Sequence, residues 1–497
     1  MMHDGGKSDR PMVPTKLPNK AGQTAAEAVE GRGLTEGNTS QQNAPRTQCR
    51  TSAPSALERV REVAKRDRKA KFTALLHHVT IDRLRDAYLA LSRKAAAGVD
   101  GMTWQQYGVR LEDNLRELHA KLHRGAYRAK PSRRVFIPKA DGRQRPLGIA
   151  SLEDKLVQRA VVEVLNCIYE ADFLGFSYGF RPGRGQHNAL DALAVAIRTK
   201  KVNWMLDADV RGFFDAIDHG WMVKFFEHRI ADRRMLRLIQ KWLSAGVLQD
   251  GKWTASEEGT PQGATVSPLA ANVHLHYVLD LWVQQWRSRH AHGDVIVVRF
   301  ADDFLVGFER KVDAERFLME LRGRLAKFSL ELHPDKTRLV EFGRFAASNR
   351  AERNLGKPET FNFLGFTHIC GKTRDGRFMV RRHTMRKRMT AKLHEVRAEL
   401  KRRRHDPIPE QGRWLGSVVR GHIAYYAVPG NVEAVRAFRY NVVRYWLREL
   451  RQRSQKHRMA WPRMSRLSDR WLPPARTTHS FPEQRFRVIT RGKSPVR

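Results

Sequence analysis

Cysteine is scarce in this sequence, which contains three in 497 residues. Cys49, Cys167 and Cys370 lie far apart, and none belongs to a CxxC pair. This spacing argues against a disulfide framework and against a zinc knuckle, and it fits a reducing compartment.

Long apolar runs are missing, and acidic residues are few for the number of basic ones. No stretch is long and apolar enough to span a bilayer, and no apolar core follows a basic start as in a secretory signal. The chain has 92 Lys and Arg against 52 Asp and Glu, for a formal net charge of +40. Such a field attracts polyanions, so we expect a nucleic acid as partner and no membrane.

The N-terminal part of the chain divides at about residue 55. Residues 1–54 are rich in Gly, Thr, Gln, Asn and Pro, a composition typical of a disordered tail. Ser55 and Glu58 have the capping-box spacing, which predicts a helix start. The apolar stripe of this helix would be narrow, and its many cations would either face solvent or contact RNA phosphates.

Two adjacent acids interrupt the apolar, β-rich stretch 295–308. The pattern predicts two strands joined by a tight turn with Asp302 and Asp303 at its tip. Adjacent carboxylates repel each other unless a cation neutralises them, and Mg²⁺ prefers such oxygen ligands. The alternative is a solvated Asp-Asp turn.

A further acid lies at the end of another expected strand, 203–209. Asp209 would supply a third carboxylate on a neighbouring strand, which could complete a cage for the two metals of phosphoryl transfer. Asp207 is the rival, because alternate strand positions share a face. Asp215 and Asp218 are more typical of turn or helix-cap acids.

Seven motifs, which include these acids, follow one another in a fixed order. They are Arg134–Lys139 with Gly142–Ile149, Phe176–Gly185, the Asp209 segment, Gly259–Gly263 with Ser267–Leu269, Phe300–Asp303, Leu330–Thr337 and Phe363–Phe366. In sequence and order they resemble group II intron reverse transcriptases and maturases. The resemblance spans about residues 75–475. Phe300 stands where the family usually has Tyr; it keeps the ring and loses the hydroxyl.

The resemblance implies roles for individual residues. Asp209, Asp302 and Asp303 would be catalytic and would bind two Mg²⁺ ions. Substrate contacts would come from Lys139 and Arg145, which would clamp the triphosphate, from Gln262 at the template–dNTP pair, from Lys336 at the leaving pyrophosphate and from Phe214, which would exclude a 2′-hydroxyl.

The resemblance also implies an α+β fold of the right-hand polymerase type, with an antiparallel sheet. Fingers and palm would occupy 55–375, a helical thumb and maturase domain X 376–475, and a short basic tail 476–497. In the helical part, Lys401, Arg402, Arg403 and Arg404 would bind RNA, unless they form a solvated helix end. Trp446, Trp461 and Trp471 would be core residues or would stack on bases.

Two His-x-His pairs, His274/His276 and His290/His292, are weak metal candidates, because the first pair lies in an expected helix where such spacing does not share a face. No cysteine pair or nuclease-like cluster follows Pro474. In this respect the sequence resembles the endonuclease-lacking branch of the family.

The expected function is RNA-directed DNA polymerase and intron maturase. Expected partners are group II intron RNA, a DNA target and primer, and dNTPs, in the bacterial cytoplasm, with the protein a monomer or homodimer. The alternatives are a catalytically silent RNA-binding splicing factor, and a retron-like or defence-associated reverse transcriptase. The acid triad argues against the first, and the extension 380–475 argues against a minimal retron enzyme.

Overall fold

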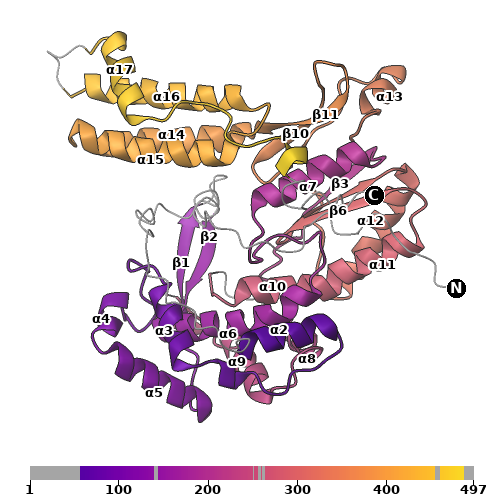
Figure 1. Cartoon of the computed structure of the whole chain (residues 1–497). Coiled ribbons are helices and arrows are strands. Elements are labelled where there is room, and N and C mark those ends of the chain that lie inside the picture. Colours follow the sequence, from indigo (N-terminus) through magenta and orange to yellow (C-terminus); the bar gives the residue numbers. More distant parts are fainter. Residues whose placement is uncertain are drawn as a thin grey trace.

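The computed structural model of the protein describes residues 56–138, 144–249, 251–255, 259, 263–453 and 459–485. Helices and three small sheets alternate along this part of the chain, and the C-terminal helices form a separate layer at the top of Figure 1. The expected mixture of helices with antiparallel sheet is confirmed.

The first layer is helical. It contains α2 (Ala56–Arg66), a 3₁₀ turn (Leu76–His78), α3 (Ile81–Leu89), α4 (Trp104–Gly108), α5 (Leu111–His123) and the long α6 (Leu152–Asp172). The helix expected near residue 56 is confirmed, and its buried side chains are Val60 and Ala64, as the narrow stripe predicts. Cys167 is buried on α6 as a free thiol.

A hairpin stands on this layer (Figure 1). It consists of β1 (Ser132–Pro138) and β2 (Gln144–Ile149), which pair antiparallel. The short strands β4 (Val247–Gln249) and β5 (Lys252–Thr254) extend the sheet in the order β2-β1-β4-β5. The hairpin thus carries the motif Arg134–Lys139 with Gly142–Ile149.

The central sheet has the order β6-β7-β3-β8, and all its pairs are antiparallel. Its strands are β3 (Trp204–Ala208), β6 (Val295–Phe300), β7 (Asp303–Phe308) and β8 (Arg338–Glu341). Leu206 and Phe304 pack on one face into the larger core, whereas Met205 and Leu305 pack on the other face into a second core.

The helices from α7 to α12 pack on this sheet or on one another. They are α7 (Gln186–Thr199), α8 (His219–Glu227), α9 (Arg233–Leu243), α10 (Ser267–Leu275), a π-helical segment (His276–Asp280), α11 (Leu281–Arg289) and α12 (Lys311–Ala326). In Figure 1, α7 lies on the side of the sheet that faces the C-terminal helices, and α11 and α12 lie on the opposite side.

The C-terminal layer begins with a third sheet, β11-β10-β9. Its elements are α13 (Ala346–Glu352), β9 (Phe361–Phe363), β10 (Phe366–Lys372), β11 (Phe378–Thr384), α14 (Arg386–Arg402), α15 (Ile408–Tyr426), α16 (Val432–Arg451) and α17 (Trp461–Trp471). The sequence left open whether Trp446, Trp461 and Trp471 are core residues. Trp446 is fully buried, whereas Trp461 is 41% exposed. Trp471 lies against Gly412, where any larger side chain on α15 would clash with its ring.

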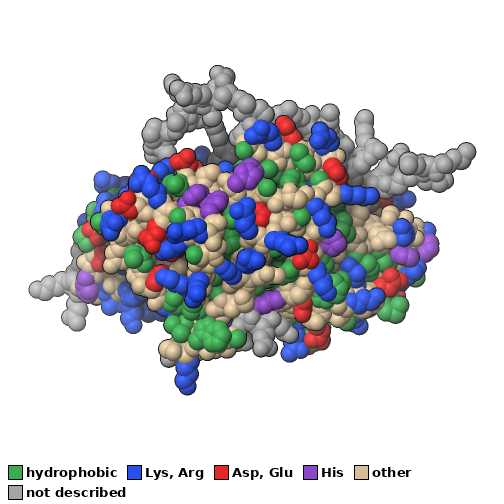
Figure 2. All heavy atoms as spheres, turned by 90° about the horizontal axis from the view of Figure 1, so that it is seen from below, with side chains coloured by type: hydrophobic (Ala, Val, Ile, Leu, Met, Phe, Trp, Pro, Cys, Tyr) green, Lys and Arg blue, Asp and Glu red, His purple; other side chains and the backbone are tan. Residues whose placement is uncertain are grey.

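Positive charge is spread over one face of the molecule. Figure 2 shows the face seen from below, where Lys and Arg side chains are scattered among fewer acids and some histidines. In the described residues, no helix is long and apolar enough to cross a membrane.

Candidate active site

The turn between β6 and β7 carries the two adjacent acids. Phe300 pairs with Asp303, so the loop consists of Ala301 and Asp302 alone. Ala301 has a φ of 57°, a left-handed conformation that such two-residue hairpin loops require and that alanine rarely adopts. The predicted hairpin is confirmed, and its strained turn needs support from its surroundings.

The end of β3 brings a third acid to this turn. Ala208 pairs with Phe304 as the last residue of β3, so Asp209 follows directly where β7 begins with Asp303. The backbone oxygen of Asp209 accepts a hydrogen bond of 2.8 Å from the amide of His333. Its carboxylate lies 2.5 Å from Nζ of Lys336. The strand end predicted from the sequence is therefore confirmed.

The acids share one electrostatic neighbourhood. Desolvation by the surrounding protein, and then the charges of Asp302, Asp209 and Asp207 in that order, raise the pKa of Asp303 well above its usual range. Part of this residue is nevertheless exposed to solvent. Arg388 on α14 opposes the rise, so a charge on the C-terminal layer reaches the acids of the central sheet.

Asp207 stays close to this group, as alternate positions on one strand should. Burial raises its pKa to about 6, Arg338 opposes the rise and Asp209 adds to it. A guanidinium nitrogen of Arg338 lies 3.9 Å from the Asp207 carboxylate. The rival acid is thus next to the site and has a basic neighbour of its own.

The carboxylates are chemically suited to a hard divalent cation. Within the ranges that the structure describes, however, no three carboxylate, imidazole or thiol groups already lie close enough to enclose an ion. Lys336 is paired with Asp209 instead. A cation at this site would therefore compete with Lys336 for the Asp209 carboxylate.

Phe214 follows the turn at Gly212, whose φ is 57°. Its ring is half-buried and meets Phe213 edge to face at 5.3 Å between centroids. A side chain at Gly259 would collide with the backbone of Phe214 and Asp215, so the chain after β5 passes directly beside Phe214.

The remaining predicted substrate residues lie at or beyond the edge of the described structure. Lys139 and Gln262 are outside the described residues. The backbone of Arg145 pairs with Ile137 in the β1–β2 hairpin. Gly263, directly after Gln262, approaches Gly148 of β2 so closely that a Cβ atom would lie 2.8 Å from the Gly148 oxygen. The chain on the C-terminal side of Gln262 is therefore packed against β2.

Comparison with known proteins decides the family. Residues 137–368 match the family described as reverse transcriptase (RNA-dependent DNA polymerase). Protein YkfC of Escherichia coli strain K12 is 34% identical over 285 residues, which cover 51% of this chain and 75% of that protein. The group II intron-encoded protein LtrA of Lactococcus lactis subsp. cremoris is 34% identical over 235 residues. The chain belongs to the group II intron reverse transcriptase and maturase family.

The matched region of this reverse transcriptase contains all the acids described above. The match to LtrA covers 47% of this chain and 39% of LtrA. A putative COX1/OXI3 intron 1 protein of Saccharomyces cerevisiae is 24% identical over 433 residues, or 73% of this chain and 51% of that protein. The chain thus spans about half or less of these two longer relatives.

Other acids and histidines of the reverse transcriptase have structural places. Asp218 caps α8 by accepting a hydrogen bond from the amide of Trp221, and Asp215 is an exposed turn residue, as predicted.

His274 and His276 are buried in α10 and the π segment, and burial lowers the pKa of each to about 4. His292 pairs with Asp313 at 3.0 Å.

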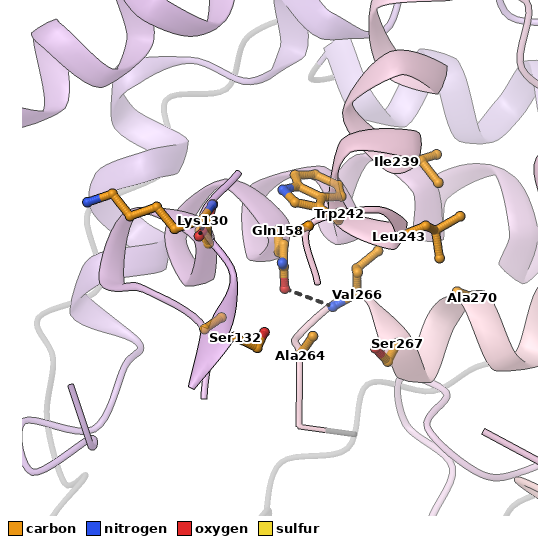
Figure 3. Close-up of a pocket in the computed structure, with 13 residues that line it drawn as sticks. Lys130, Ser132, Gln158, Ile239, Trp242, Leu243, Ala264, Val266, Ser267 and Ala270 are labelled. Atoms are coloured by element: carbon orange, nitrogen blue, oxygen red, sulfur yellow. Dashed lines mark hydrogen bonds between the residues drawn. The ribbon is translucent and has the colours of Figure 1, made fainter. Parts of the chain in front are cut away.

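A pocket lies apart from the acids and contains none of the three. It is lined by Lys130, Ser132, Asp154, Gln158, Trp242 and Val266, among others. In Figure 3, the Gln158 amide points at the loop before α10, where its oxygen accepts hydrogen bonds from the amides of Thr265 and Val266. The pocket therefore marks a joint between α6, α9 and the start of α10.

The four basic residues 401–404 at the end of α14 differ in their exposure and in their contacts. Lys401 and Arg402 are exposed, although Arg402 pairs with Glu399 at 2.5 Å. Arg403 pairs with Glu399 and lies over the ring of Trp414. Arg404 lies 2.7 Å from Glu449. The prediction that all four bind RNA stays a prediction, and Arg403 and Arg404 already have structural partners.

Sequence reasoning missed one set of residues at the acid turn. Arg299 is fully buried and contacts Asp280, Asn272, Ser177 and the backbone of the turn. The sequence offered one indication of a buried ion pair: Arg299 directly follows the apolar run 295–298, and a buried arginine needs an acidic partner. Its side-chain partners lie 19 to 122 residues away in sequence, so no local pattern identifies them.

Proposed function

We propose that this protein is an RNA-directed DNA polymerase and intron maturase that binds group II intron RNA, assists its splicing and copies it into DNA during retrohoming. The supporting observation is that Asp209, directly after β3, and Asp302 and Asp303, at the β6–β7 turn, lie at the same end of the central sheet, inside the region that matches reverse transcriptases.

The proposed division of the chain follows the right-hand polymerases. Fingers and palm would extend to residue 375, with the β1–β2 hairpin in the fingers and the central sheet in the palm. The thumb and maturase domain X would comprise 376–475, including α14 to α17, and the basic tail would begin at 476. Arg388 and the layer it belongs to would then close over the palm.

The proposed reaction is attack of a primer 3′ oxygen on the α-phosphorus of a dNTP, with pyrophosphate leaving. Asp209, Asp302 and Asp303 would hold two Mg²⁺ ions. Bound there, the ions would supply Lewis-acid stabilisation of the attacking and leaving oxygens. Lys336 would move from Asp209 to the phosphates, and the β1–β2 hairpin would bring Arg145 and Lys139 to the triphosphate.

The maturase activity would depend on the net charge of +40 and on the C-terminal layer. Further partners would be the DNA target and its primer, so the protein would act on nucleic acid in the bacterial cytoplasm. The polymerase site argues for copying as well as binding, since a pure splicing factor has no need for clustered carboxylates.

The test is Asp302→Asn, which removes a metal ligand and one charge. We expect primer extension on an RNA template to be abolished, with RNA affinity nearly unchanged. Asp113→Asn, at an exposed acid on α5, is the matched control. Primer extension measured beside filter binding decides the matter: extension by the Asp302 variant at the wild-type rate would refute the assignment.

A further inference from the structure

Arg299 is the largest buried charge near the acid turn. It lies on β6, three residues before Asp302, and its side chain is fully buried. The opposite charge comes from Asp280, which is also fully buried and receives two hydrogen bonds from the guanidinium, of 2.7 Å from Nε and 2.6 Å from a terminal nitrogen. The pair is bidentate, an arrangement that fixes orientation as well as charge.

The other donors of Arg299 are directed at three different segments. One terminal nitrogen donates to Oδ1 of Asn272 at 3.0 Å and to the backbone oxygen of Ala301 at 2.9 Å. The second terminal nitrogen donates to Oγ of Ser177 at 2.7 Å. All three guanidinium nitrogens therefore have acceptors, and one acceptor is the backbone of the residue directly before Asp302.

The same residues hold the strained turn from its other side. Asn272 donates to the backbone oxygen of Gly179 at 2.7 Å. Gly179 lies so close to the turn that a Cβ atom there would be 2.2 Å from the Ala301 nitrogen. The segment before Gly179 runs along β6, with hydrogen bonds from Tyr178 to Arg299 and from Arg299 to Phe176. The left-handed Ala301 is thus enclosed by backbone and by the Arg299 fork.

The position of Asp280 also has a local cause. It is the last residue of the π-helical segment between α10 and α11. A π-helical turn inserts an extra residue in a helix and changes the direction of the side chains after it, and such turns are frequent at functional sites. Here the turn supplies a carboxylate to the underside of the acid hairpin.

We propose that Arg299, held by Asp280 and Asn272, is a positioning residue that fixes the Ala301 carbonyl and so aims Asp302 and Asp303 at the divalent cations. This inference rests on the proposed function, because it assumes that these acids bind metal. Arg299 itself is fully buried, so it would touch neither substrate nor metal. It acts as outer-shell partners of metal ligands do, by orienting groups that would otherwise diverge.

The variant that tests it is Arg299→Lys, which keeps a positive charge beside Asp280. A single ammonium group cannot replace a planar fork that donates to five acceptor atoms on four residues. Arg229→Lys is the matched control, since Arg229 is also buried, pairs with Asp172 at 3.0 Å and donates to the backbone oxygen of Asp67. Asp302→Asn reports on the metal site itself.

Two measurements are made on the full-length chain. Mn²⁺ binding is followed by electron paramagnetic resonance without nucleotide, and the Mg²⁺ dependence of single-nucleotide extension is followed in parallel. For Arg299→Lys we expect the Mn²⁺ dissociation constant and the half-saturating Mg²⁺ concentration to rise about 10-fold or more, as for other outer-shell variants. Extension at saturating Mg²⁺ and primer–template affinity should stay close to wild type, and Arg229→Lys should show wild-type metal values.

The outcomes separate this inference from the proposed function. If Asp302→Asn loses Mn²⁺ while Arg299→Lys binds it like wild type, Arg299 is only structural and the inference fails alone. If Asp302→Asn keeps both Mn²⁺ binding and extension, the acid assignment fails and the inference fails with it. Should Arg299→Lys not fold, Asn272→Ala replaces it, because that variant removes one acceptor of Arg299 and the hydrogen bond to Gly179. Metal binding by Asn272→Ala at the wild-type level would then overturn the inference.

Discussion

Lys336 links a basic side chain to the acid site, where its Nζ lies 2.5 Å from the Asp209 carboxylate. Both groups are partly exposed, so the pair contributes little to stability. Its proposed role is functional: Lys336 neutralises the Asp209 carboxylate and would move to the negatively charged leaving pyrophosphate.

We therefore expect Lys336→Met to slow nucleotide incorporation. Loss of a cation or proton donor at the leaving pyrophosphate should lower kcat by about 100-fold, the lower end for general acid catalysis. Rapid-quench measurement of single-nucleotide incorporation tests this. Lys327→Met, at an exposed lysine beyond α12, is the control. Equal kcat values for Lys336→Met and wild type would exclude the role.

Phe214 lies five residues after Asp209, and its proposed role is contact with the sugar of an incoming nucleotide. Phe214→Ala should open space for a 2′-hydroxyl and raise the ratio of kcat/KM for rNTP over dNTP by roughly 10-fold or more, the scale of steric discrimination in such pockets. Phe345→Ala removes a 51% exposed ring elsewhere and is the control. An unchanged ratio in Phe214→Ala would mean that its half-buried ring serves packing alone.

Local patterns in the sequence predicted where the acids lie in the strands and the turn, while their roles stay predictions. Asp302 and Asp303 were identifiable because a two-residue turn between apolar strands is encoded by its neighbours. The choice between Asp207 and Asp209 could not be predicted in this way, because the two acids have the spacing of one strand face. The basic partner of each acid, Lys336 for Asp209 and Arg338 for Asp207, lies more than 120 residues away in the sequence. The partners of Arg299 escaped prediction for the same reason.

At the scale of elements, helix α14 ends in a basic run with two kinds of residue. Lys401 and Arg402 project from the helix, whereas Arg403 and Arg404 join α14 to its surroundings through Trp414 and Glu449. The sequence predicted where this helix ends but not this division, because the partners of Arg403 and Arg404 come from α15 and α16.

Replacing the two pairs separately should therefore give different results. Lys401→Ala with Arg402→Ala should make the slope of log K against log salt for intron RNA shallower by about 0.7–0.9 for each phosphate that the variant no longer neutralises, and should slow protein-assisted splicing. Arg403→Ala with Arg404→Ala should mainly lower the thermal unfolding midpoint. Filter binding over a salt series, with thermal unfolding of both variants, tests this. An unchanged slope for the first pair would identify it as a solvated helix end.

If extension on a simple primer–template falls together with splicing in the Lys401/Arg402 variant, the run serves the proposed thumb. A separate maturase surface would then have to be sought elsewhere on the C-terminal layer. The acids at Asp209 and Asp302 are untouched in this variant, so a loss of extension could not come from the metal ligands.

At the scale of the whole molecule, the two cores meet at the central sheet. The second core runs from the inner face of that sheet into the C-terminal helices, so these parts are joined by apolar packing. Buried charge adds to the joint: Arg382 of β11 pairs with Asp191 of α7 at 3.0 Å, and Arg485 contacts the same acid. The position of the C-terminal layer relative to the acids is therefore set by several contacts at once.

Buried histidines should make this assembly sensitive to mild acid. Burial lowers the pKa of His422 to about 3, that of His368 to about 3 and that of His187 to about 2. The unfolded chain has an ordinary histidine pKa near 6.5, so below that pH the unfolded state binds more protons than the folded state. The contribution of these histidines to stability should be complete above pH 6.5 and should be lost as the pH falls below it.

His422→Leu tests this at one position, where the ring stacks on Phe438 at 3.6 Å between centroids. The free energy of unfolding of wild type should fall between pH 6.5 and 5.5, and the fall should be smaller in the variant by roughly 1 kcal/mol, the contribution of one histidine over this interval. Urea unfolding at the two pH values measures the difference, which is independent of any packing loss common to both. His394→Leu, at an exposed position of α14, should leave the fall unchanged. An equal fall in His422→Leu and wild type would show that His422 can be protonated in the folded protein, and the acid sensitivity would then have to come from other groups.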